Sequence, residues 1–230
     1  DHLIVEDIER KPLSYHEVIL RSFVLGRLFK RKLGTQKHVG LLLPNAVSTV
    51  LSFFALQAIG RTPAMLNFTA GSSQIQSACR AAVITDVITS RRFIQMAKLE
   101  HITQELEASG ITLRYLEDLR DQVSLFDKLA AKMAACFPHC FAAKTAPEDT
   151  AVILFTSGSE GIPKGVALSH ENIQANRYQL SARVDFGPQD IVFNALPMFH
   201  SFGLTGGTLL PVLSGIRAFY YPSPLHYRIV

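Results

Sequence analysis

The sequence predicts an α/β fold in which parallel-rich sheets are flanked by helices. Short apolar runs alternate along the chain with segments that have the length and spacing of helices, a pattern typical of βαβ units. Capping residues and glycines mark where several of these segments begin and end. With 230 residues, the chain is long enough to bury a sizeable core in one large domain or two small ones.

The first two helices are predicted from their boundary residues. Ser14-Tyr-His-Glu17 matches the capping box, in which the serine hydroxyl and the glutamate carboxylate each satisfy a free backbone N–H. A helix should therefore run from there to about Leu33. A short apolar strand follows at 39–43. Residues 46–59 then carry helical spacing and stop at Gly60, which suits a left-handed cap.

The remaining elements continue this alternation. Further strands are predicted at the short apolar runs 63–66, 83–88, 112–116 and 152–155. After a glycine-rich loop, the predicted elements are a helix at 172–182, a strand at 191–195, a helix at 203–213 and a strand at 216–220. Alternation of this kind predicts a mostly parallel sheet.

Composition excludes a disordered chain and gives little support to a nucleic-acid partner. Hydrophobic residues make up 48% of the chain and charged residues 18%, below the roughly 25% of an average soluble protein. The 23 basic and 19 acidic side chains leave a net charge of only +4. We therefore expect a folded protein that does not bind nucleic acid.

Cysteine usage favours a reducing, cytosolic setting. Cys79, Cys136 and Cys140 are too few for a disulfide framework, and the chain starts without a signal-peptide pattern. The last two cysteines flank His139, but no second ligand pair lies nearby, so we expect no metal site. The most apolar stretch, 47–59, is too interrupted for a membrane span, which needs ~18 apolar residues. It is predicted to be a buried helix.

Four basic residues cluster where the first predicted helix ends: Arg27, Lys30, Arg31 and Lys32. Cations at a helix C-terminus complement the helix dipole, which is one explanation of the cluster. The alternative is a docking patch for an acidic partner.

Between 120 and 150 the pattern changes to an amphipathic helix. Its apolar side chains recur at spacings of three and four residues beside two lysines: Phe126, Leu129, Met133 and Phe137, with Lys128 and Lys132. This stripe either packs on the sheet, as most amphipathic helices do, or lies on a membrane surface.

The most informative segment is 152–165, where a buried strand runs straight into a polar loop. A polyphosphate needs backbone N–H groups at close range, hydroxyl donors and a cation. The loop supplies all three from Gly158, Gly161 and Gly165, with Thr156, Ser157, Ser159 and Lys164. It is not a Walker A loop, because Pro163 stands where that motif requires glycine, and it is not G-x-G-x-x-G. The alternative is a flexible surface turn.

The order of residues in this loop, Thr-Ser-Gly-Ser-Glu-Gly-Ile-Pro-Lys-Gly-Val, resembles the phosphate-loop signature of the adenylate-forming acyl-ligase superfamily. That superfamily includes acyl-CoA synthetases, luciferases and the adenylation domains of peptide synthetases. Other matches follow in the family's order: Leu13–Glu17, Val39–Asn45, Phe53–Gly60, Leu168–Asn172 and Ala195–Gly203. The resemblance covers almost the whole chain. It implies the N-terminal part of a synthetase domain, with a first α/β portion at 1–148 and the phosphate loop and a following α/β segment at 149–230.

The resemblance implies a reaction in two steps. A fatty-acid carboxylate attacks the α-phosphate of MgATP to give an acyl-adenylate and pyrophosphate, and a phosphopantetheine thiol then takes the acyl group. The implied cofactors are ATP and Mg²⁺, with the magnesium ligand expected outside these 230 residues.

The resemblance also implies roles for single residues. The nucleotide-binding set is Thr156, Ser157, Gly158, Ser159, Glu160, Gly161, Lys164 and Gly165. The catalytic residues are Lys164, whose charge assists as pyrophosphate develops, and His200, for which a buried core histidine is the alternative. The fatty-acid-binding set is Phe199, His200, Phe202 and Gly203. Most of the superfamily has threonine in place of Glu160, whose carboxylate would repel phosphate, so we assign Glu160 no catalytic role.

Glu160 and three further segments resemble one class within the superfamily: 63–71, 115–119 and 221–230. This class comprises bacterial acyl-[acyl-carrier-protein] synthetases joined to an upstream 2-acylglycerophosphoethanolamine acyltransferase. The resemblance implies acyl carrier protein as the acceptor, a lysophospholipid as the substrate of the upstream domain, and a role in phosphatidylethanolamine turnover. It also implies a place in the bacterial cytoplasm, at the cytoplasmic face of the inner membrane, with a peripheral membrane contact.

Two other functions fit the same residues. One is an acyl-CoA synthetase of the same superfamily, and the other is a non-catalytic module that binds a nucleotide or a partner protein. The superfamily's later elements do not occur: the sequence has no Tyr-Gly-x-Thr-Glu segment, no Thr-Gly-Asp segment and no C-terminal lid. We therefore expect both ends to be truncated and this chain alone to be inactive or nearly so.

Overall fold

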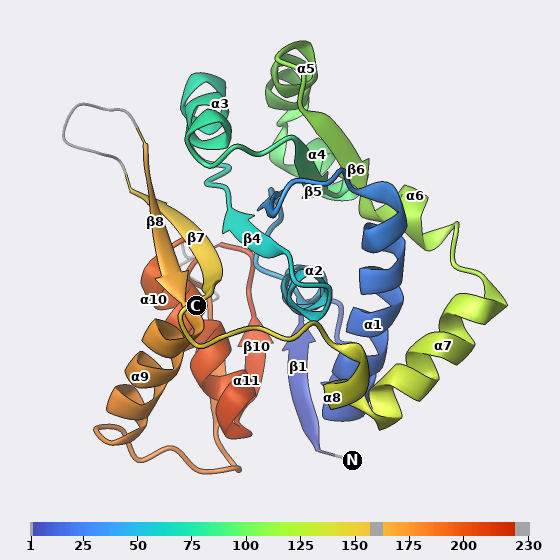
Figure 1. Cartoon of the computed structure of the whole chain (residues 1–230). Helices are drawn as coiled ribbons and strands as arrows, with labels where there is room; N and C mark the ends of the chain where they lie inside the picture. The colour runs from blue at the N-terminus through green and yellow to red at the C-terminus, as the bar shows by residue number, and fades with distance from the viewer. Residues whose placement is uncertain (1, 157–162, 224–230) are drawn as a thin grey trace.

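The computed structural model describes residues 2–156 and 163–223, which fold into two sheets with helices between and around them (Figure 1). The strands are β1 (Leu3–Asp7), β2 (Leu13–Ser14), β3 (His38–Leu41), β4 (Thr62–Met65), β5 (Asp86–Thr89), β6 (Thr112–Tyr115), β7 (Thr150–Thr156), β8 (Lys164–Ser169), β9 (Ile191–Asn194) and β10 (Arg217–Tyr220). The helices before β7 are α1 (Tyr15–Lys32), α2 (Val47–Ala58), α3 (Ser72–Ala81), α4 (Arg91–Ala97), α5 (Glu100–Ala108), α6 (Leu116–Arg120), α7 (Leu125–Cys136) and α8 (Pro138–Phe141). The helices after β8 are α9 (His170–Ser181), α10 (Ser201–Leu204), a π-helical turn (Thr205–Leu209) and α11 (Leu210–Ser214).

The predicted α/β fold with parallel-rich sheets is confirmed. The six-stranded sheet has the order β6-β5-β3-β4-β7-β8, and the four-stranded sheet has the order β2-β1-β10-β9. Among the described strands, only the β7–β8 and β1–β2 pairs are antiparallel. Residues before 149 and residues after it contribute strands to both sheets.

The local signals for the first two helices are also confirmed. Ser14 caps α1, because its hydroxyl accepts the Glu17 N–H while the Glu17 carboxylate accepts the Ser14 N–H at 2.9 Å. Helix α2 ends before Gly60, whose φ of +72° lies in the left-handed region that favours glycine. No helix among the described residues is long and apolar enough to cross a membrane.

Helix α2 is the buried helix that its composition predicts. It lies between the two sheets (Figure 1), and its Val50 and Leu56 are fully buried. They share one core cluster with Val5 of β1 and Leu41 of β3. A second cluster, built around Ile75, covers the other face of the six-stranded sheet beneath α3 and α5.

Two predicted elements differ from the structure. The strand predicted at 83–88 begins only at Asp86, because Val83 has a positive φ of 52° in the turn that follows α3. The helix predicted at 203–213 is three pieces, because a π-helical turn separates α10 from α11.

Three strands of the structure are not predicted by the sequence pattern: β1, β2 and β8. Strand β1 has only five residues, and its main partner is β10, about as far away as the chain allows. Arg217 of β10 forms an ion pair with the buried Glu6 of β1, so the pairing is also fixed by charge. Strand β8 directly follows a stretch rich in glycine and serine, a composition that is typical of loops.

Helix α7 is held on α1 by one buried carboxylate. Asp127 is fully buried and accepts two hydrogen bonds from Arg31, at 2.7 and 3.0 Å, and one from Arg27 at 3.2 Å. Ser124 also donates to it in a second capping box. Of the four clustered basic residues, Arg27 and Arg31 therefore bind a carboxylate within the molecule. This role is separate from any interaction with the helix dipole.

These contacts predict an acid-sensitive stability. Hydrogen bonds from Arg31, and further ones from Ser124 and Arg27, hold the pKa of Asp127 well below its usual range, despite burial. A lowered pKa in the folded state contributes stability above the unfolded pKa of about 4, and that stability is lost as the pH falls below it. We expect the Asp127→Asn variant to be less stable at pH 7 and to have a flatter stability profile between about pH 5 and 3.

Urea unfolding at each pH measures this profile. The matched control is Asp121→Asn, which removes an exposed carboxylate outside the ion pair. Equal pH slopes for wild type and Asp127→Asn would contradict the assignment.

The expectation that the α7 stripe packs on a sheet is wrong. Phe126, Leu129, Met133 and Phe137 are all exposed, and α7 packs on α1 with its opposite side. The ion pair of Asp127 decides this orientation, because it turns that side of the helix toward α1.

Candidate functional site

The predicted phosphate loop connects the two strands of an antiparallel hairpin. In this hairpin Thr156 at the end of β7 lies opposite Lys164 at the start of β8, and Phe155 lies opposite Gly165. Residues 151–154 of β7 are buried, which anchors the hairpin in the sheet. The loop residues with predicted roles, Ser157, Gly158, Ser159, Glu160 and Gly161, lie outside the described residues.

Lys164 has the surroundings expected of an anion-binding group. Its side chain is exposed, and its ammonium forms no ion pair or hydrogen bond with a described residue. Thr156, directly across the hairpin, is also exposed and can present its hydroxyl at the same end of the loop. A cation and a hydroxyl at the base of a glycine-rich loop fit a polyphosphate.

Gly165 is not required by packing. A Cβ built there would lie 3.4 Å from Ile153 Cγ2 and 3.5 Å from Phe155 Cε1, which are ordinary contacts. The described neighbours of Gly165 therefore leave room for a side chain. The role of Gly165 in nucleotide binding stays a prediction.

The His200 segment follows β9 and leads into α10. His200 is exposed and its backbone caps α10, so the alternative of a buried core histidine is wrong. Its ring lies 4.7 Å from that of Phe199, between centroids. Phe199 is the buried member of the pair and packs edge-to-face on Phe68 with centroids 5.0 Å apart. Packing thus explains Phe199, and its contact with an acyl chain stays a prediction.

The Phe199–Phe68 contact brings the His200 segment to the phosphate hairpin's sheet. Phe68 follows the carboxyl end of β4, and β4 is the parallel neighbour of β7, which ends at Thr156. The His200 segment and Thr156 are therefore placed at the same edge of the six-stranded sheet. Ligands of open α/β sheets bind outside this carboxyl edge.

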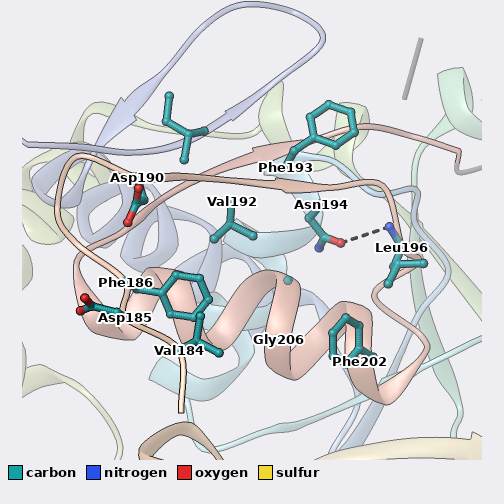
Figure 2. Close-up of a pocket in the computed structure, with 12 residues that line it drawn as sticks. Val184, Asp185, Phe186, Asp190, Val192, Phe193, Asn194, Leu196, Phe202 and Gly206 are labelled. Atoms are coloured by element: carbon teal, nitrogen blue, oxygen red, sulfur yellow. Dashed lines mark hydrogen bonds between the residues drawn. The ribbon is translucent and has the colours of Figure 1, made fainter. Parts of the chain in front are cut away.

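A buried amide network holds the His200 segment in place. Asn194 Nδ2 donates to Gly203 O at 3.0 Å and to Thr208 Oγ1 at 3.2 Å. Its Oδ1 accepts the Leu196 N–H at 3.1 Å (Figure 2). Asn45 Nδ2 donates to Asn194 O at 2.7 Å. The sequence analysis gave neither asparagine a role. A sequence signal for both exists, because each asparagine lies at or just beyond the carboxyl end of a strand. Asn45 follows β3, and Asn194 is the last residue of β9.

Gly203 is needed for a close approach of two backbone segments. A Cβ there would lie 2.2 Å from Pro197 O and 2.6 Å from Leu196 O. Because no side chain fits this gap, α10 can fold back directly over the residues that precede it. The predicted role of Gly203 in fatty-acid binding therefore has a structural alternative.

The cavity in Figure 2, about 520 Å³, lies beside β9 and the π-helical turn. Asp185 and Asp190 lie at one end and Leu196 and Phe202 at the other, with mainly apolar side chains between them (Figure 2). Phe202 is the one predicted fatty-acid-binding residue among its lining, and Lys164 is not part of it. The cavity suits an apolar group, and its two carboxylates disfavour an anion at that end. It is not the phosphate site.

The described residues fit phosphate better than they fit a metal ion. Among the residues that the structure describes, none forms an ion pair or side-chain hydrogen bond with Lys164 or Thr156. Residues 2–156 and 163–223 contain no group of three His, Cys, Asp or Glu side chains placed to hold a metal ion. Within this part of the chain, binding of a nucleotide would rely on Lys164, Thr156 and backbone N–H groups.

Comparisons with known proteins identify the family of this chain. The sequence profile of the family described as AMP-binding enzyme matches residues 1–229. The chain is 27% identical to a 4-coumarate-CoA ligase 1 of Narcissus pseudonarcissus over 94% of this chain and 38% of that protein. It is 29% identical to a long-chain-fatty-acid–CoA ligase of Bacillus subtilis (strain 168) over 85% of this chain and 39% of that protein.

Solved structures share the fold. The crystal structure of a fatty acid AMP ligase from Legionella pneumophila superposes with a TM-score of 0.77 over 99% of this chain and 38% of that chain, at 18% sequence identity. The chain thus spans about two fifths of the length of the proteins that it matches.

Proposed function

Because the chain belongs to the AMP-binding enzyme family, we propose that the complete protein uses ATP to activate a fatty acid as an acyl-adenylate and passes the acyl group to acyl carrier protein. In the first step a carboxylate oxygen attacks the α-phosphorus and pyrophosphate leaves. In the second, a thiol loses its proton, its sulfur attacks the acyl carbon, and AMP leaves. The product acyl group would serve reacylation of a lysophospholipid by an upstream acyltransferase domain.

One observation carries the first step. The phosphate-loop sequence joins β7 to β8, and at its base lies an exposed Lys164, opposite Thr156, that pairs with no residue in the described part of the chain. Lys164 would neutralise charge that develops on the departing pyrophosphate, and the Thr156 hydroxyl would help to hold the phosphates. His200, held beside the same sheet edge by Phe199 and Asn194, would orient the carboxylate.

The choice of a fatty acid is supported by the relatives' names, which include long-chain fatty-acid–CoA ligases. The choice of acyl carrier protein, and of the cytoplasmic face of the bacterial inner membrane as the site of action, rests on the sequence resemblance at Glu160, 63–71, 115–119 and 221–230. The same relatives favour an alternative acceptor, because their names specify CoA ligases. The two alternatives share the adenylation step and differ in the thiol.

Fatty-acid-dependent ATP–pyrophosphate exchange by the complete protein tests the first step. We expect exchange with a fatty acid and none without a carboxylate. The 230-residue chain alone should show little or no exchange. If none of the carboxylates tested supports exchange by the complete protein, but the protein binds MgATP, a nucleotide-binding module replaces the enzyme proposal.

The acceptor is tested separately, with the acyl-adenylate formed first. Transfer of radiolabelled acyl groups to holo-acyl carrier protein, with little transfer to CoA, would support the carrier-protein proposal. Preferential transfer to CoA would replace it with an acyl-CoA synthetase.

A further inference from the structure

Helices α7 and α8 present an apolar face to solvent. It consists of six side chains with exposed fractions between 49% and 78%: Leu125, Phe126, Leu129, Met133, Phe137 and Phe141. We refer to these six residues as the α7–α8 face. Exposed apolar patches of this kind mark surfaces that contact a partner or a membrane.

The orientation of this face is fixed by the other side of α7. Asp127, Ala131 and Ala134 are buried there, against α1. Asp127 is tied to Arg27 and Arg31 of α1, so the helix cannot roll without breaking a buried ion pair. Because this ion pair fixes the rotation of α7 about its axis, the apolar side chains on its other side point away from the core.

The exposed residues of the α7–α8 segment that carry a formal charge are all basic. Lys128 and Lys132 are exposed on α7, and Lys144 is exposed shortly after α8. Between residues 124 and 145 the only acidic residue is Asp127, which is buried and neutralised. The surface around the α7–α8 face thus offers cations and no carboxylate from this segment.

We propose that the α7–α8 face rests on the surface of an anionic lipid bilayer. Aromatic and aliphatic side chains on one side of a short helix, with lysines beside them, are the pattern of a helix that lies in the plane of the membrane interface. The lysines would meet lipid phosphates, and each contributes through charge near such a surface. The exposed formal charge of residues 124–145 is cationic, which favours an anionic surface. The six exposed apolar side chains favour lipid over a hydrated polyanion.

The position of the face agrees with this role. It lies on the opposite side of the molecule from the β7–β8 hairpin, so a bilayer there leaves the hairpin open (Figure 1). The proposal does not depend on the reaction, because none of its residues belongs to the candidate site.

Vesicle flotation of the complete protein tests the proposal. The vesicles are phosphatidylcholine alone, or phosphatidylcholine with one third phosphatidylglycerol. We expect binding to the anionic vesicles and a partition coefficient at least tenfold lower for the double variant Phe126→Asp plus Phe137→Asp. The matched control is Met96→Asp plus Tyr178→Asp, which adds the same charge at positions 68% and 64% exposed outside the face, and should bind like wild type.

A second variant separates the charges from the apolar side chains. Lys128→Gln plus Lys132→Gln should weaken binding to the anionic vesicles about 30-fold and leave binding to phosphatidylcholine unchanged. Unchanged thermal unfolding, and unchanged ATP–pyrophosphate exchange in vesicle-free buffer if the enzyme proposal holds, show that each variant is folded.

Two results would overturn the proposal. If the Phe126→Asp plus Phe137→Asp variant partitions like wild type, the face is covered in the complete protein or does not touch lipid. If that variant instead abolishes self-association in sedimentation velocity, and wild type does not bind vesicles, the face is an interface between copies of the protein. Failure of the enzyme proposal would leave vesicle binding unaffected, so the two failures are distinguishable.

Discussion

Replacing Lys164 by alanine in the complete protein should lower fatty-acid-dependent ATP–pyrophosphate exchange about 100-fold or more. Lys164 starts β8 with an exposed ammonium that no described residue neutralises, so its charge is available to the phosphates. Loss of one preorganised group that stabilises developing charge typically costs a factor of roughly 100 to 1,000 in rate. The loss should fall mainly on the rate constant, because the charge on the departing pyrophosphate is greatest in the transition state.

The control is Lys37→Ala, which removes an equally exposed lysine outside the hairpin. It should exchange like wild type, which excludes a general effect of net charge. Lys164→Arg keeps the charge but changes its shape, and should recover part of the rate. If Lys164→Ala exchanges normally while the wild type is active, Lys164 is not the group that neutralises pyrophosphate.

Replacing Gly203 by alanine should destabilise the fold by about 2–3 kcal/mol and also lower exchange. The new Cβ would lie 2.2 Å from the Pro197 carbonyl oxygen, and a backbone atom cannot yield as a side chain can. The clash must move α10 or the preceding turn, and His200 lies between them. The variant should therefore unfold at a lower urea concentration and, because His200 is displaced, should also show slower ATP–pyrophosphate exchange.

Gly206→Ala provides the matched control within the same helical stretch. A Cβ there would lie 3.5 Å from the Phe202 ring, an ordinary contact. Alanine also favours helical backbone over glycine by roughly 0.5–1 kcal/mol. We expect this variant to be as stable as wild type or slightly more stable. A Gly203→Ala protein as stable as Gly206→Ala would show that the backbone approach at Pro197 is not tight.

Local signals predicted those elements whose boundaries are set by neighbouring residues. The capping box of Ser14 and Glu17 and the left-handed Gly60 act over a few residues, so α1 and α2 could be predicted. Strand β1 could not, because its pairing depends on β10 at the other end of the described chain. The stripe on α7 was predicted, but the side that faces the core is chosen by an ion pair between Asp127 and an arginine 96 residues away.

The candidate site divides in the same way. The phosphate loop could be predicted because its chemistry is continuous in sequence, and the structure places its two ends, Thr156 and Lys164, opposite each other. The support of His200 could not be predicted. It depends on Phe68 beneath Phe199, a contact between segments 131 residues apart, and on the amide of Asn194, whose hydrogen-bond partners no residue pattern marks in advance.

The parallel pairing of β1 with β10 has a consequence for how the protein is made. A ribosome adds about 5–20 residues per second, so roughly 10–40 s separate the synthesis of these two strands. All strands of the six-stranded sheet are synthesised by residue 169, well before β10. During vectorial synthesis, β1 therefore lacks its parallel partner until β10 is made, although Val5 can already pack against Val50 and Leu56 of α2. Until then, the edge of β1 that will face β10 carries unpaired backbone N–H and C=O groups, which can pair with another chain.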